Sequence, residues 1–75
     1  MLRLVDARGL LCPLPLLRAR EALATLAPGE DLVVLATDPE APIDLAALAA
    51  DHGLMFDQEQ SGGEWRLTLR TSERP

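Results

Sequence analysis

The residue best suited to covalent chemistry is Cys12, the only cysteine in this chain of 75 residues. It stands in the stretch Gly-Leu-Leu-Cys-Pro-Leu-Pro, residues 9–15, just before a segment with helical spacing. With Cys12 as the N-cap of that helix, Pro13 and Pro15 occupy its first and third positions. A backbone N–H there has no partner within the helix, so proline is tolerated. Because each proline fixes its own φ angle, the turn that carries the sulfur is predicted to be stiff.

Such a position predicts a reactive thiol. The N–H groups of Cys12 and Leu14 would have no helical partners, and together with the helix dipole they favour an anion at the sulfur. A cysteine at a helix N-terminus has a lowered pKa, and the thiolate is its nucleophilic form. Arg8, across the turn at Gly9, would add positive charge. The alternative is a cysteine buried for packing, which is common in small domains but needs no such proline pattern.

Two further polar residues have both structural and chemical interpretations. The carboxyl ends of parallel strands meet at one edge of a sheet, where ligand sites form, and this would bring Thr37 and Asp38 towards Gly9 and Cys12. Asp38 would then orient the loop or contact a partner, or it would cap the turn into a following helix. His52, the only histidine, is expected to complement a helix dipole and not to serve Cys12 as a base.

Three leucines surround the thiol in the sequence: Leu10, Leu11 and Leu14. We expect Leu10 to be buried in the core, and Leu11 or Leu14 to remain at least partly exposed. An exposed apolar patch with a charged rim is typical of a surface that binds another protein. Leu11 and Leu14 are therefore predicted to form a docking surface for a partner.

Hydrophobic patterning predicts the element order β-α-β-α-β-β around these residues. The predicted elements are a strand over 2–7, a helix from Cys12 that stops at Pro28-Gly29, a buried strand over 31–37, a second helix over 42–52, and strands over 54–60 and 65–71. A right-handed crossover makes the first two strands parallel, and the last two form an antiparallel pair. The expected fold class is an α/β two-layer sandwich, a mixed four-stranded sheet with two helices on one face.

The glycines at positions 62–63 predict the register of the last two strands, because a two-glycine loop is a strong hairpin signal. With that loop, Phe56 lies opposite Leu69 and Glu59 lies opposite Arg66. The apolar residues of both strands then share one face and the charged residues take the other.

Composition excludes several functions. One cysteine and one histidine form neither an internal disulfide nor a structural zinc site, and no cofactor is expected. A net charge of −5 argues against direct binding to nucleic acid, which requires a basic surface. No apolar run is long enough to span a membrane, and the first residues do not form a signal peptide. We therefore expect a single cytoplasmic domain over residues 1–75.

These motifs resemble those of a known family. Asp-Ala-Arg-Gly-Leu at 6–10, followed by Cys-Pro-Leu-Pro at 12–15, closely resembles the signature of the TusA/SirA family of small sulfur carriers, which has a Cys-Pro-x-Pro core. Pro-Gly-Glu at 28–30 and Ala-Thr-Asp-Pro at 36–39 are also similar to segments of that family at similar spacing. The resemblance extends over nearly the whole chain, roughly residues 4–70.

The resemblance implies a function. Members of this family accept a sulfane sulfur on the motif cysteine as a persulfide, from a cysteine desulfurase or a rhodanese-like donor, and pass it to an acceptor protein. By position, Cys12 would be the carrier, a sulfurtransferase only in a loose sense because each partner supplies half of the transfer site. Arg8, Gly9, Pro13, Pro15 and Asp38 are interpreted as the residues that shape this site.

The route that the sulfur follows stays open. Leu11, Leu14 and Ile43 stand where members that serve tRNA thiolation often carry charged residues. The resemblance therefore supports membership of the family more strongly than it supports the tRNA route. Molybdenum-cofactor synthesis and sulfur oxidation are the other routes. Two other functions are possible: a non-catalytic interaction module that docks through the Cys-Pro-Leu-Pro loop, and a redox-sensing thiol. The lack of a second cysteine makes the redox sensor the weakest of the three.

Overall fold

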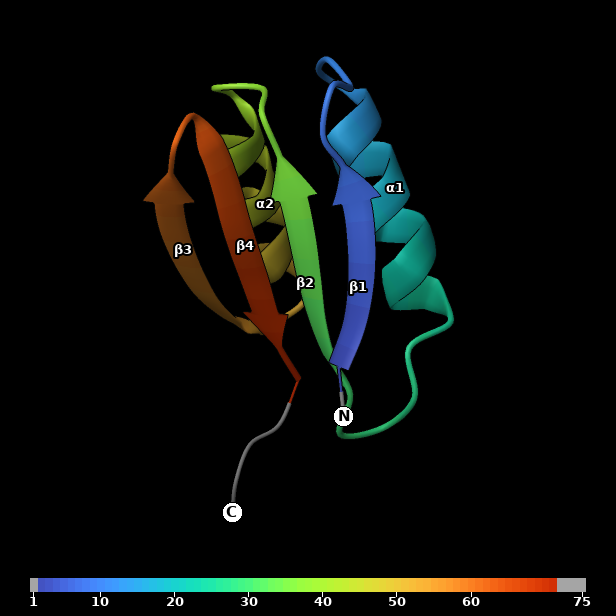
Figure 1. Cartoon of the computed structure of the whole chain (residues 1–75). Coiled ribbons are helices and arrows are strands. Elements are labelled where there is room, and N and C mark those ends of the chain that lie inside the picture. The colour runs from blue at the N-terminus through green and yellow to red at the C-terminus, as the bar shows by residue number, and fades with distance from the viewer. Residues whose placement is uncertain (1, 72–75) are drawn as a thin grey trace.

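The computed structural model describes residues 2–71, and it has the predicted element order (Figure 1). The elements are β1 (Leu2–Ala7), α1 (Leu14–Ala24), β2 (Asp31–Ala36), α2 (Ala41–Asp51), β3 (Met55–Ser61) and β4 (Glu64–Arg70). The predicted strands and second helix agree with these bounds to within one or two residues. None of the helices described for residues 2–71 has the length and apolarity needed to cross a membrane.

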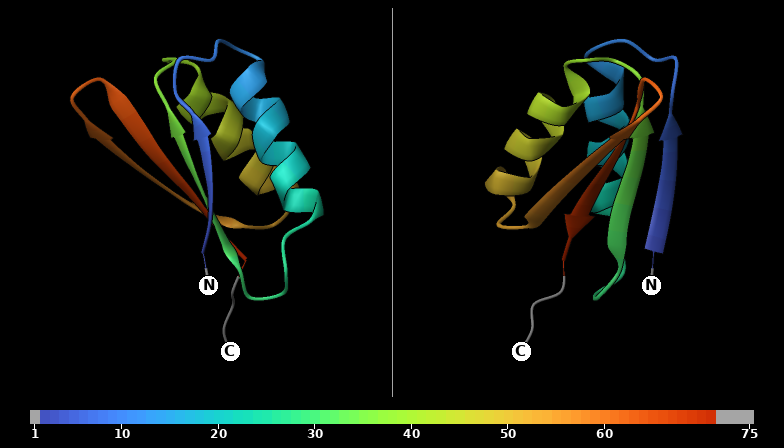
Figure 2. Two further views of the ribbon diagram at one scale, coloured as in Figure 1. Left: turned by 45° about the vertical axis from the view of Figure 1, so that its right-hand side comes forward. Right: turned by 60° about the vertical axis from the view of Figure 1, so that its left-hand side comes forward.

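The four strands form one mixed sheet in the order β1-β2-β4-β3. β1 and β2 are parallel, and β4 runs antiparallel to both of its neighbours, β2 and β3. Both helices cover the same face of the sheet, as the turned views in Figure 2 show. The two-layer sandwich expected from the sequence is therefore confirmed.

The core lies between the helices and the covered face of the sheet. Its fully buried large side chains include Leu32 and Val34 from β2, Leu45 from α2, and Leu67 and Leu69 from β4. Alternate residues of a strand point to one face, so these positions all lie under the helices. Apart from the aromatic residues Phe56 and Trp65, which are partly buried at its edge, the core is aliphatic.

The hairpin between β3 and β4 has the predicted register. Phe56 pairs with Leu69, and Glu59 pairs with Arg66. The two loop residues, Gly62 and Gly63, have φ angles of 57° and 80°. A tight two-residue hairpin loop that matches the twist of its strands requires two consecutive positive φ values, and glycine adopts them without strain.

The first helix is shorter than the sequence predicts at its C-terminal end. Its last residue is Ala24, so it stops before Leu26 and well short of Pro28. Thr25 closes it by donating its backbone N–H and its hydroxyl to the carbonyl of Ala22. The residue before a proline avoids helical backbone angles, so Ala27 is disfavoured as a continuation of the helix towards Pro28.

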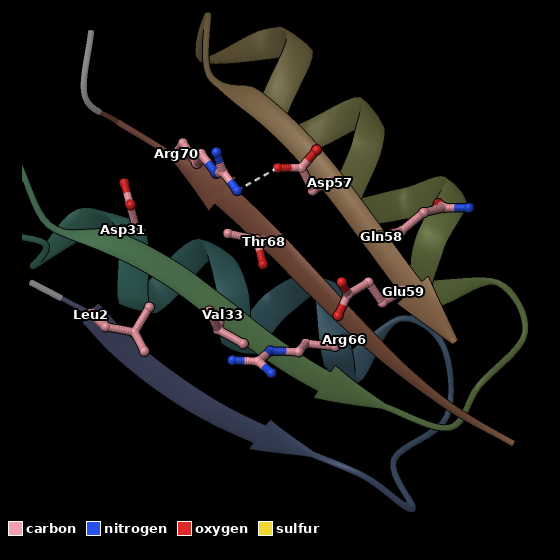
Figure 3. A pocket seen from close by; sticks show the side chains of 9 residues that line it. All are labelled: Leu2, Asp31, Val33, Asp57, Gln58, Glu59, Arg66, Thr68 and Arg70. Carbon is pink, nitrogen blue, oxygen red and sulfur yellow. Dashed lines mark ion pairs between the residues drawn. The ribbon is translucent and has the colours of Figure 1, made fainter. Parts of the chain in front are cut away.

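The opposite face of the sheet carries no helix and contains a hollow that Figure 3 shows from close by. Asp57 and Arg70 form an ion pair at 2.8 Å there, on neighbouring strands. The residues that line this hollow all belong to strands: Leu2, Asp31, Val33, Asp57, Gln58, Glu59, Arg66, Thr68 and Arg70. None of them belongs to the loop that carries Cys12.

Candidate functional site

Cys12 lies in the loop between β1 and α1, beside the loop between β2 and α2. These loops share one end of the sheet because β1 and β2 are parallel, with Ala7 paired to Ala36 at their ends (Figure 1). The backbone N–H of Gly9 donates to the hydroxyl of Thr37 at 2.9 Å and joins the loops directly. Gly9 has a φ of 82°, which other residues rarely adopt. The predicted approach of these residues is confirmed.

Asp38 forms the second link between the two loops, and it does so with a carboxylate that is only 7% exposed. One oxygen accepts a hydrogen bond from the backbone N–H of Cys12. The other oxygen accepts from the backbone N–H of Glu40 at 3.1 Å and so shapes the turn into α2. The two interpretations of Asp38 therefore hold together: it orients the cysteine loop, and it also caps the next turn. Hydrogen bonds to both oxygens offset the cost of burying the charge.

The helix after Cys12 begins one residue later than predicted. Pro13 is the N-cap, Leu14 is the first helical residue, and Pro15 is the second. Cys12 therefore precedes the helix, joined to Pro13 by a cis peptide bond. The backbone N–H of Leu14 donates to the carbonyl of Leu11 at 2.8 Å, and that of Cys12 is taken by Asp38. Neither N–H is left to bind an anion at the sulfur, so that expectation was wrong.

The Cys12 thiol is exposed and forms no disulfide, and its hydrogen-bond partner is a carboxylate. The Sγ atom lies 3.4 Å from Oδ2 of Asp44 in the first turn of α2. This hydrogen bond raises the pKa of the Cys12 thiol above its ordinary value, because it stabilises the protonated form. Partial desolvation and the charges of Asp44, Glu40 and Asp38 raise it further. The lowered pKa expected from the sequence is therefore contradicted for the free protein.

Arg8 does not supply the positive charge that the sequence suggested for the thiol. Its guanidinium pairs with Asp6 at 2.8 Å and with Glu64 at 3.6 Å. It is not among the groups that shift the pKa of Cys12. It holds the pKa of Asp6 at about 2, chiefly through the hydrogen bonds from its side chain and its backbone N–H. Arg8 therefore forms ion pairs with residues of β1 and β4 and not with the thiol.

Exposed apolar residues adjoin Cys12 and Asp44 in the chain. Leu11 is 71% exposed and Leu14 is 41% exposed, so both predicted docking residues are accessible. Leu10 is only partly buried, packed against the core, where full burial was expected. Ile43, one residue before the thiol-bonded Asp44, is also 71% exposed. We call Leu11, Leu14 and Ile43 the apolar rim of the site.

Pro15 and His52 are two further residues considered from the sequence. Pro15 is fully buried and anchors the start of α1 below the exposed Pro13. His52 follows α2, and its Nδ1 lies 3.1 Å from the carbonyl oxygen of Leu48. It stands about two helical turns from Asp44, roughly 12 Å along the axis, and is not a base for the thiol. Within residues 2–71, no group of three or more potential ligands is placed to hold a metal ion.

Two residues of the site, Glu40 and Asp44, were not identified from the sequence, and Ile43 was considered only for the route that the sulfur follows. A signal for them exists, because parallel strands place the starts of both following helices at the same edge of the sheet. Any residue in the first turn of the second helix therefore lies near the loop of the first. What patterning does not give is which side of that turn faces the sulfur.

Comparison with known proteins identifies the family of this chain. Residues 3–71 match the family model described as Sulfurtransferase TusA. The chain is 42% identical over 67 residues to a Neisseria meningitidis protein provisionally named as a sulfur carrier, covering 88% of this chain and 90% of that one. It is 38% identical over 69 residues to the sulfur carrier protein TusA of Allochromatium vinosum, covering 91% of each chain.

A solved structure shares the fold. The crystal structure of a SirA-like protein from Desulfitobacterium hafniense superimposes with a TM-score of 0.85 at 31% identity, covering 97% of this chain and 100% of that one. The family model spans both loops of the site, including Cys12 and Asp38. By sequence and by fold, the chain belongs to the TusA/SirA family.

Proposed function

We propose that this protein is a sulfur carrier that binds a sulfane sulfur on Cys12 as a persulfide and passes it to an acceptor protein. The observation that carries the proposal is an exposed, unpaired thiol in the Cys-Pro-Leu-Pro loop of a chain from this family. The loop is tied to its neighbour by Gly9 and Asp38, so the sulfur is presented in a fixed position. A fixed nucleophile loses little entropy when a partner docks.

The transfer consists of two exchanges at sulfur. The Cys12 thiolate attacks the outer sulfur of a donor persulfide, the S–S bond of the donor breaks, and the donor leaves as a thiolate. An acceptor thiolate then attacks the outer sulfur on Cys12, and the Cys12 thiolate is regenerated. The sulfane sulfur keeps its oxidation state, so no external oxidant or reductant is needed. No second cysteine in the chain competes for the bound sulfur.

Donor and acceptor would bind in turn at the apolar rim. Leu11 and Ile43, each 71% exposed, adjoin Cys12 and Asp44 in the chain, and they would be covered in each complex. A small transient interface is sufficient for a carrier that has to leave each partner quickly. We propose a cysteine desulfurase or a rhodanese-like protein as the donor class. A reducing compartment such as the cytoplasm would keep the unloaded thiol free.

Substitution of the thiol tests this function. We expect Cys12→Ser to abolish loading, because the hydroxyl does not form a persulfide, while the fold is unchanged at this exposed position. The measurement is intact-protein mass spectrometry after incubation with a cysteine desulfurase and free cysteine, and separately with a rhodanese and thiosulfate. The wild-type protein should gain the mass of one sulfur atom, reversibly under a reductant. No gain with either donor, or an equal gain in Cys12→Ser, would contradict the proposal.

The exposure of the apolar rim also favours a second function, that of a binding module without sulfur transfer. In that case the loop docks through its leucines and the thiol is incidental. Binding to a partner would then survive Cys12→Ser and be lost in Leu11→Asp, with no loading of either variant or of the wild-type protein.

A further inference from the structure

The surroundings of the Cys12 sulfur are acidic on the side of α2. Sγ lies 3.4 Å from Oδ2 of Asp44, and Asp38 binds the backbone N–H of the same residue. Glu40 stands between these two carboxylates in the sequence, as the N-cap of α2. Three negative charges from one loop and one helical turn therefore act on a single exposed thiol.

Within residues 2–71, no cation is among the groups that shift the pKa of the Cys12 thiol. Arg8, on the loop that carries Cys12, is paired with Asp6 and Glu64. Among residues 2–71, the charged groups that act on the pKa of the thiol are carboxylates, and all of them raise it. α1 carries Arg18 and Arg20, and neither is among the groups that shift the pKa of the thiol. The free protein therefore holds the sulfur in its less nucleophilic form.

A sulfur carrier has to be a thiolate during the exchange, so Cys12 has to lose its proton when a partner docks. We propose that Asp44 is a positioning residue that holds the Cys12 sulfur as a hydrogen-bonded thiol in the free protein. A cationic side chain of the sulfur-exchanging partner then pairs with Asp44, and the Cys12 sulfur is released from its hydrogen bond. This inference rests on the proposed function, and it identifies the partner surface as a basic group beside an apolar patch that covers Ile43.

The release fits the chemistry of the first exchange. When a partner cation pairs with Asp44, the carboxylate no longer accepts the S–H bond, and the added positive charge favours the thiolate. The thiol proton passes to solvent, the thiolate attacks the outer sulfur of the donor persulfide, and the donor thiolate leaves. Outside the complex, the thiol is protected from stray electrophiles because it is protonated.

Alkylation of the free protein tests the role of Asp44 without any sulfur donor. The rate of reaction with iodoacetamide is measured against pH for the wild-type protein, Asp44→Asn and Asp51→Asn. Asp51 is a matched control, because it is an exposed aspartate at the other end of α2. Glu40→Gln is a second variant, and it should shift the pH–rate profile in the same direction as Asp44→Asn but by less. Circular dichroism checks the fold of each.

We expect the pH–rate profile of Asp44→Asn to move to lower pH and that of Asp51→Asn to stay with the wild type. At neutral pH the gain in thiolate is partly offset by lower nucleophilicity, and we expect a net rise in rate on the order of threefold. An unchanged profile would show that the contact is only structural. A shift to higher pH would show that Asp44 helps to remove the proton. Either result would overturn the inference.

Loading by a cysteine desulfurase tests the partner's cation. Although its thiol is more reactive, Asp44→Asn should load more slowly than the wild type at low ionic strength, by about threefold or more, because the pairing charge is lost. The difference should shrink as salt is added. Faster loading of Asp44→Asn at all salt concentrations would overturn this part. Failure of the wild type to load would contradict the proposed function and the partner's role, while the alkylation profiles would still decide the role of Asp44.

Discussion

At the residue scale, the site depends on how single carboxylates are shared between loops. Asp38 is almost fully buried, and each of its oxygens accepts a backbone N–H from a different loop. Asp44 is less buried and accepts from the thiol. Two aspartates six positions apart therefore have different tasks, one holding the backbone of Cys12 and the other holding its sulfur.

Arg8 offers a prediction at the same scale. Its hydrogen bonds hold the pKa of Asp6 at about 2, against a usual 3.8. We expect Arg8→Ala to return the Asp6 pKa towards 3.8, and Arg70→Ala, which removes a cation paired to Asp57, to leave it unchanged. The measurement is an NMR titration of the Asp6 carboxyl group.

The sign for stability follows from the lowered pKa. The ion pair stabilises the folded state above the unfolded pKa of Asp6, and this contribution is lost as the pH falls from about 4 towards 2. Arg8→Ala should therefore lose stability at neutral pH and less at pH 2. An Asp6 pKa that stays near 2 in Arg8→Ala would contradict this account.

At the element scale, the hairpin depends on its two glycines. A Cβ added at either would have no atom within 4 Å, so the cost of substitution is conformational only. With a φ of 80°, Gly63→Ala should lower the free energy of unfolding by about 1–2 kcal/mol. Gly62→Asn should cost less, because asparagine tolerates this region. Urea unfolding measures both, and equal costs would contradict the role assigned to backbone angle.

The sequence predicted the strands, the second helix and the hairpin register better than the ends of α1. Alternation of apolar residues and a two-glycine loop leave one register for Phe56 and Leu69. The start of α1 is different, because a proline pattern fits an N-cap at Cys12 or at Pro13. The choice depends on Asp38, a residue 26 positions away, which takes the N–H of Cys12. The sequence therefore predicted that the loops of Cys12 and Asp38 lie side by side, but not the contact between Asp44 and the thiol.

At the scale of the whole molecule, a small aliphatic core stabilises the chain. At roughly 0.05–0.15 kcal/mol per residue, its 75 residues give a total of about 4–11 kcal/mol. Leu45 of α2 is fully buried in this core.

We expect Leu45→Ala to lower the free energy of unfolding by about 2–5 kcal/mol, a large share of that total. Met55→Ala, at a position 64% exposed, should change it by less than about 0.5 kcal/mol. Thermal unfolding measures both. A loss below about 1 kcal/mol for Leu45→Ala would contradict the burial described for this side chain.

The direction of the strands has a practical consequence. β1 begins and β4 ends at the end of the sheet opposite to the Cys12 loop (Figure 1). A tether attached beyond either strand therefore stands away from the thiol. Protein anchored through such a tether to an optical biosensor would present its thiol outward, and a second folded module fused there would leave the thiol accessible.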